Sequence, residues 1–139
     1  MDKIKIFLDS DVIISAILSK TGASYEILKN PQITKVVSET IKAEVNDVAR
    51  RLNIIFSNEN IFGKMEVISL KLDKARLVKI YLPYVLDEED SHVVAGVVNS
   101  KSRFLLTHNI KHYQVEKMKR DLEIITMKPG IFLQYLRSS

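Results

Sequence analysis

The sequence contains no cysteine. This absence excludes a disulfide framework and any zinc or redox site built on thiolates, and it fits the reducing environment of the cytoplasm. The sequence also lacks a run of the roughly 20 apolar residues that a membrane-spanning helix requires. The apolar stretch within residues 4–9 is too short for a signal peptide and is interrupted by a lysine. We therefore expect a soluble, cytoplasmic protein without a membrane partner.

No internal repeat, low-complexity tract or linker divides the chain, so its 139 residues predict a single domain, 1–139. Hydrophobic residues make up 46% and charged residues 27%, as is ordinary for a globular protein. A domain of this size folds without a metal, so a bound metal would serve function. The net charge of +4 favours approach to a polyanion such as RNA but does not identify a nucleic-acid-binding protein by itself.

Short apolar runs alternate with segments of helical spacing. The runs predict strands at residues 4–9, 34–37, 103–107 and 122–126. The helical segments are residues 12–18 (capped by Ser10 or Asp11), 24–30, 39–52 (capped by Ser38), 87–99, 113–120 and 129–136. This alternation predicts an α/β sandwich around a mainly parallel sheet.

Residues 58–81 are the least distinct part of the chain. Their spacing is mostly helical, and the sequence leaves open a break at Gly63 and a further strand near residues 80–85.

Four oxygen-bearing side chains follow separate strands of the predicted sheet: Asp9, Glu44, Asp90 and Asn109. In a parallel sheet, the segments after the strands meet at one edge, where ligands bind. Three carboxylates held together there repel one another unless a hard cation such as Mg²⁺ or Mn²⁺ joins them. Such an ion can polarise a phosphoryl group and activate water, so the pattern predicts phosphodiester hydrolysis.

Each of these residues also has a simpler interpretation when taken alone. Asp9 can cap a helix, Glu44 can be a solvated helix residue, and Asn109 can belong to a turn. Asp90 lies in a run of four acids, and carboxylates are favoured at a helix N-terminus.

The order of motifs along the chain resembles the PIN domain family. LDSDVIISAIL (8–18) resembles the family's opening motif, and VSETIKAEV (37–45) resembles the second, which ends on Glu44. LDEEDSHVVAGVV (86–98) resembles the third, whose acid is Asp90, and FLLTHNIKHY (104–113) resembles the segment that closes the site. ITMKPGIFLQYL (125–136) resembles the usual ending. Within the family, the chain is most similar to small prokaryotic VapC-like proteins of toxin–antitoxin pairs.

The resemblance implies a three-layer α/β/α fold with a parallel sheet of four or five strands. It implies cleavage of RNA that depends on Mg²⁺ or Mn²⁺, a cognate antitoxin as a partner, and a homodimer. Asp9, Glu44 and Asp90 would be the catalytic metal ligands, with Asn109 as a further ligand.

Two positions depart from the family's usual pattern. Asn109 stands where many members have aspartate, and His112 stands where they have another acid. Asn109 can still bind a metal through its carbonyl oxygen, but it brings no charge, so we expect one firmly bound ion rather than two.

Five other residues are assigned supporting roles. Asp11 and Thr107 would orient ligands and waters, and Asp87 would be a helix cap next to the site rather than a ligand. Lys111 and His112 would contact RNA phosphate at the rim, although a solvated turn is an equal alternative.

Two other functions compete with the nuclease. A non-catalytic member of the family would bind RNA or a protein partner without turnover. A phospho-acceptor domain with Asp9 in its acidic pocket is disfavoured, because no suitably placed acceptor aspartate follows a central strand and the accompanying lysine is missing.

Overall fold

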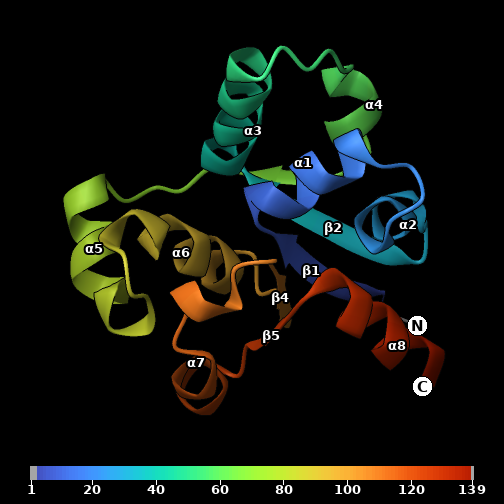
Figure 1. Ribbon diagram of the computed structural model, residues 1–139. Coiled ribbons are helices and arrows are strands. Elements are labelled where there is room, and N and C mark those ends of the chain that lie inside the picture. The colour runs from blue at the N-terminus through green and yellow to red at the C-terminus, as the bar shows by residue number, and fades with distance from the viewer. Residues whose placement is uncertain (1–2, 139) are drawn as a thin grey trace.

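The computed structural model describes residues 3–138 and contains a five-stranded parallel sheet (Figure 1). The strands lie in the order β3-β2-β1-β4-β5, which makes the first strand of the sequence the central one. The predicted α/β class and the parallel sheet are confirmed. The strands are β1 (Ile4–Leu8), β2 (Ile33–Ser38), β3 (Glu66–Ile68), β4 (Phe104–Leu106) and β5 (Ile125–Met127).

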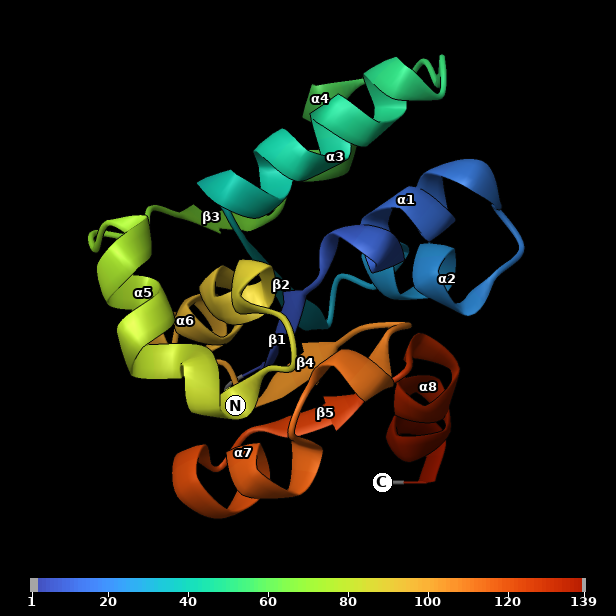
Figure 2. The ribbon, with the colours of Figure 1, turned by 60° about the vertical axis from the view of Figure 1, so that its left-hand side comes forward.

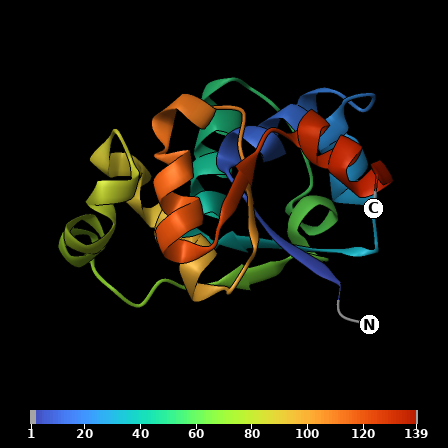
Figure 3. The same ribbon diagram turned by 90° about the horizontal axis from the view of Figure 1, so that it is seen from below.

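Helices cover both faces of this sheet. On one side lie α1 (Ser10–Leu18), α2 (Ala23–Lys29) and α8 (Pro129–Ser138), and on the other α5 (Lys74–Tyr81), α6 (Ser91–Asn99) and α7 (Val115–Leu122) (Figure 2). α3 (Glu39–Arg51) packs against α1 and is followed by α4 (Asn58–Phe62). The last helix returns to α2 (Figure 3). There Arg137 pairs with Glu26 at 3.3 Å. Within residues 3–138, the helices are too short or too polar to cross a bilayer.

The central strands are apolar at consecutive positions because both of their faces are covered. Phe7 of β1, Val36 of β2 and Leu105 of β4 are completely buried. The fifth strand begins three residues later than the sequence predicts. The reason is Glu123, which adopts a left-handed conformation (φ 58°) and ends α7 just before β5.

The region between residues 55 and 85 differs most from the prediction. It forms α4, β3, α5 and a 3₁₀ turn, η1 (Leu82–Tyr84), instead of one mostly helical segment. β3 is an edge strand of three residues, too short to show an alternating pattern. No strand of the sheet forms near residues 80–85, where Val85 makes a single antiparallel bridge to Tyr113. The break at Gly63 is confirmed, because Gly63 is the C-cap of α4.

The predicted cap of α3 is confirmed, whereas that of α1 is wrong. The Ser38 hydroxyl accepts a hydrogen bond from the backbone of Ile41 at 3.1 Å. The cap of α1 is Asp9 rather than Ser10 or Asp11, and its carboxylate accepts from the Ser10 backbone at 2.8 Å. β1 ends one residue before Asp9 and α1 starts one residue after it, so Ser10 and Asp11 already lie inside the helix.

The strand order creates a switch point between β1 and β4. β2 and β3 extend the sheet on one side of β1, while β4 and β5 extend it on the other. Connections that diverge in this way leave a crevice beyond the carboxyl ends of the two strands. Leu8 is paired in register with Leu106 there, so Asp9 and Thr107 leave the sheet side by side.

Helix α6 approaches β1 closely through Gly96. A methyl group at this position would overlap the ring of Phe7, which is completely buried. The small residue therefore sets the distance between this helix and the central strand.

We expect Gly96→Ala to lower the free energy of unfolding by roughly 1–3 kcal/mol, because overpacking against a buried ring outweighs the gain in helix propensity. Denaturant unfolding measures the change. Gly130→Ala is the matched control, since a methyl group there has no heavy atom within 4 Å, and it should leave stability unchanged or slightly higher. Equal effects of the two substitutions would contradict this account of the packing.

Candidate acidic active site

Asp9 lies at the switch point and is fixed by three donors. One carboxylate oxygen, Oδ1, accepts from the backbone of Ser10 at 2.8 Å. The other, Oδ2, accepts from the hydroxyls of Thr107 at 3.0 Å and Tyr113 at 2.8 Å. Asp9 is only 8% exposed, and its backbone N–H donates to Leu106 of the neighbouring strand at 3.0 Å. Strand pairing and side-chain hydrogen bonds thus hold this carboxylate in one orientation.

Asp11, two residues after Asp9 and in the first turn of α1, faces the loop after β4. Its carboxylate accepts from the backbone of His108 at 3.2 Å and from the side-chain amide of Asn109 at 2.8 Å. Thr107 is also within 3.3 Å, so its one hydroxyl proton can reach either Asp9 or Asp11. Burial, reinforced by the charge of Asp9, raises the pKa of Asp11 to about 6.

Asp90 brings a third carboxylate to the same region. It ends a 3₁₀ turn, η2 (Glu88–Asp90), directly before α6. Burial raises the pKa of Asp90, and the negative charge of Asp9 raises it further. The ring of His112 lies 3.3 Å from the Asp90 carboxylate and partly offsets this repulsion.

A short backbone pairing holds the Asp90 segment beside the loop that follows β4. Val85 and Tyr113 form an antiparallel bridge, and the backbone N–H of Leu86 donates to the carbonyl of His112 at 2.9 Å. The chain reaches Asp90 four residues after this pairing. Two acids that are distant in the sequence are thereby brought to one place.

Tyr113 is a site residue that sequence reasoning missed. It is 5% exposed, and its pKa is raised by burial first and then by the charges of Asp9, Asp90 and Asp11. The phenol therefore stays protonated and donates to Asp9. The only signal was its place at the end of the motif FLLTHNIKHY; nothing local indicates a hydroxyl that reaches back 104 positions in the chain.

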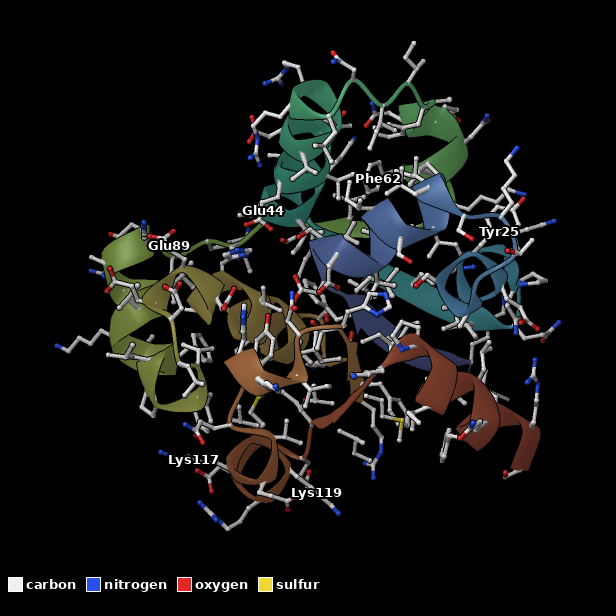
Figure 4. The ribbon with its side chains drawn as sticks, viewed as in Figure 1. Tyr25, Glu44, Phe62, Glu89, Lys117 and Lys119 are labelled. Atoms are coloured by element: carbon white, nitrogen blue, oxygen red, sulfur yellow. The ribbon has the colours of Figure 1, made fainter. Side chains whose placement is uncertain are left out.

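Glu44 takes part in a different contact. Its carboxylate lies 3.1 Å from Nε2 of His92, and Figure 4 places it on the part of α3 that faces α6. In the described chain, no hydrogen bond or ion pair joins Glu44 to the aspartates. The side chain of His92, the partner of Glu44, is only 13% exposed.

The remaining predicted residues lie around these acids. Asp87 caps η2 by accepting from the backbone of Glu89 at 3.0 Å, which agrees with its predicted role as a cap. Lys111 and His112 are both exposed and lie on a 3₁₀ turn, η3 (Ile110–His112). The metal-binding and catalytic roles of the acids stay predictions.

The chemistry of this site fits a hard divalent cation. Asp9, Asp11 and Asp90 supply carboxylate oxygens, and the raised pKa values of Asp11 and Asp90 reflect burial and repulsion that a cation would relieve. Across residues 3–138, no three histidine, aspartate or glutamate side chains form a group that could hold an ion as they stand. Mg²⁺ commonly keeps several waters and takes only one or two carboxylates directly, so a preformed three-ligand cluster is not required.

Comparisons with known proteins agree with this architecture. A chain in the crystal structure of VapBC2 from Rickettsia felis bound to a DNA fragment from their promoter superposes with a TM-score of 0.56 and 16% identity, covering 90% of this chain and 98% of that one. A chain of a toxin–antitoxin complex from Klebsiella pneumoniae gives a TM-score of 0.64 and 18% identity, covering 89% and 97%. At these identities the likeness is one of fold. The search of curated proteins found no match.

The sequence provides the assignment that the structural likeness alone does not. Residues 5–111 match the PIN domain, a span that contains Asp9, Glu44, Asp90 and Asn109. Because the match covers most of the chain, this protein belongs to the PIN domain family.

Proposed function

We propose that this protein is a ribonuclease that depends on Mg²⁺ or Mn²⁺. The observation that carries the proposal is the gathering of Asp9, Asp11 and Asp90 at the switch point of the sheet, where the charge of Asp9 acts on both of the others. Membership of the PIN family supports the same reaction class. Acids crowded at such a crevice are costly to fold unless they bind a cation.

Asp9, Glu44 and Asp90 are the proposed metal ligands, directly or through water, and the carbonyl oxygen of Asn109 is a fourth candidate. Once bound, an ion of this kind polarises a phosphoryl oxygen and makes nearby water more acidic. Glu44 would join the set by exchanging its contact with His92 for one with the ion or with a water.

The chain's own groups set the orientation of these ligands. Thr107 and Tyr113 each donate to Oδ2 of Asp9, which limits rotation of the carboxylate. Asp11, tied to the loop after β4 by His108 and Asn109, keeps that loop against the start of α1. We propose that Lys111 and His112, both exposed on η3, contact RNA phosphates.

We further propose that the protein acts as the toxin of a toxin–antitoxin pair, with a cognate antitoxin as its partner. The support is the fold shared with chains from the Rickettsia felis and Klebsiella pneumoniae complexes. The homodimer that the family resemblance implies stays a prediction.

A non-catalytic, RNA-binding or partner-binding role is the alternative. It is favoured by Asn109, whose amide nitrogen points to Asp11 at 2.8 Å rather than offering its oxygen there. Such a protein would bind RNA or its partner without turnover, so a cleavage assay separates the two functions.

The purified protein should cleave single-stranded RNA with Mg²⁺ or Mn²⁺ and not with EDTA. We expect Asp90→Asn to lower kcat at least about 100-fold, because it removes a charge from the ion's ligands. Asp47→Asn is the matched control, since Asp47 is exposed on α3, and it should retain wild-type rates. Equal cleavage by the Asp90 variant, or full activity in EDTA, would refute the metal-dependent mechanism.

The raised pKa of Asp11 predicts how stability depends on pH in EDTA. A carboxyl whose pKa rises from 3.8 to about 6 on folding stabilises the fold fully below pH 4, and this contribution is lost as pH rises through 6. The free energy of unfolding should therefore fall by roughly 1–3 kcal/mol more in the wild type than in Asp11→Asn between these limits. Denaturant unfolding at several pH values measures the difference. If the free energy of unfolding changes with pH equally in the wild type and in Asp11→Asn, the raised pKa of Asp11 is contradicted.

A further inference from the structure

A groove of about 670 Å³ lies directly beside the acidic site. Its floor is formed by Thr126 and Met127 at the end of β5, and its walls are η3 and the first turn of α8. It opens beyond the carboxyl ends of β4 and β5, on the same edge of the sheet as Asp9. The nuclease proposal uses Asn109, Lys111 and His112 of this lining and leaves its other residues without a role.

Two residues connect the groove to the acids. Asn109 lines the groove and donates to Asp11 at 2.8 Å, and His112 lines it and lies 3.3 Å from Asp90. If an RNA strand has one phosphate at the aspartates, its neighbouring nucleotide would therefore lie at the mouth of the groove.

The charge of the groove is opposite to that of the acidic site. Lys111 and Lys128 stand on its two walls, both exposed. Neither forms an ion pair within the described part of the chain, and no aspartate or glutamate of that part lines the groove. The groove also adjoins the positive end of α8, which favours a phosphate over a neutral ligand.

The rest of the lining offers an apolar surface. Ile110, Met127 and Ile131 present aliphatic side chains, and Ile131 is 51% exposed although it is a large hydrophobic residue. An exposed apolar surface beside two lysines suits a ligand that has both a phosphate and a flat, weakly polar ring.

We propose that the groove holds an unpaired nucleotide of the RNA, next to the phosphate that is cleaved. This inference rests on the proposed ribonuclease function. The base packs on Ile110, Met127 and Ile131, and Lys128 binds the flanking phosphate. A base can enter only if it is unstacked from its neighbours, so the substrate is single-stranded or looped RNA rather than a duplex.

The test combines a binding arm with a kinetic arm. The binding arm uses Asp90→Asn protein in EDTA and a fluorescent single-stranded RNA oligonucleotide, with the matched duplex as the competing form. Lys128→Ala added to this protein should weaken binding of the single strand about 5–10-fold and reduce the dependence of log K on log salt by about one unit. Lys119→Ala is the control, because Lys119 projects from α7 away from the sheet (Figure 4) and should change binding less than about two-fold.

In the kinetic arm, Lys128→Ala should raise KM by a similar factor and leave kcat within about two-fold of wild type, because no hydrogen bond or ion pair among the described residues joins Lys128 to the aspartates. Equal effects of Lys128→Ala and Lys119→Ala, or duplex bound as tightly as single strand, would overturn the groove assignment even if RNA is cleaved. Absence of cleavage with any metal, together with binding that still depends on Lys128, would instead refute the ribonuclease and keep the groove.

Discussion

The carboxylate of Asp9 is the constraint on which the site depends. It leaves the central strand at the switch point and is held by the backbone of Ser10 and by the hydroxyls of Thr107 and Tyr113. These donors come from the start of α1, the end of β4 and the bridge to Val85. One buried side chain therefore joins three segments of the chain.

The charge of Asp9 explains the behaviour of its neighbours. Asp11 and Asp90 are both partly buried, and each is repelled by Asp9, so each holds its proton more strongly than an isolated aspartate. A protein gains nothing in stability from such an arrangement. Crowding of this kind is common where a fold is adapted to bind a cation or to move protons. Negative charge at the acids and positive charge in the adjoining groove together suit a cation and a phosphodiester chain bound side by side.

The sequence predicted those features that depend on local patterns. Consecutive apolar residues identified the buried central strands, and the acid after the first strand indicated the edge of the sheet at which the acids meet. The expectation that Asp90 also follows a strand was wrong, because 3₁₀ turns precede it. It did not predict β3, because three residues at a sheet edge carry too little pattern. It also missed Tyr113, whose role arises only when the chain folds back on itself. The pairing of Glu44 with His92 was hidden for the same reason, since it depends on how α3 and α6 pack.

The antiparallel bridge between Val85 and Tyr113 has a consequence for how this fold can vary. It positions the chain immediately before the third acid, downstream of the path taken from β2 to residue 84. Insertions or deletions around α4 and β3 can therefore be absorbed upstream of Asp90, whereas α5 is tied to this segment through its packing on α6 and the pair of Lys74 with Glu89. A partner-specific surface could evolve in that region while the geometry of the acidic crevice stayed the same.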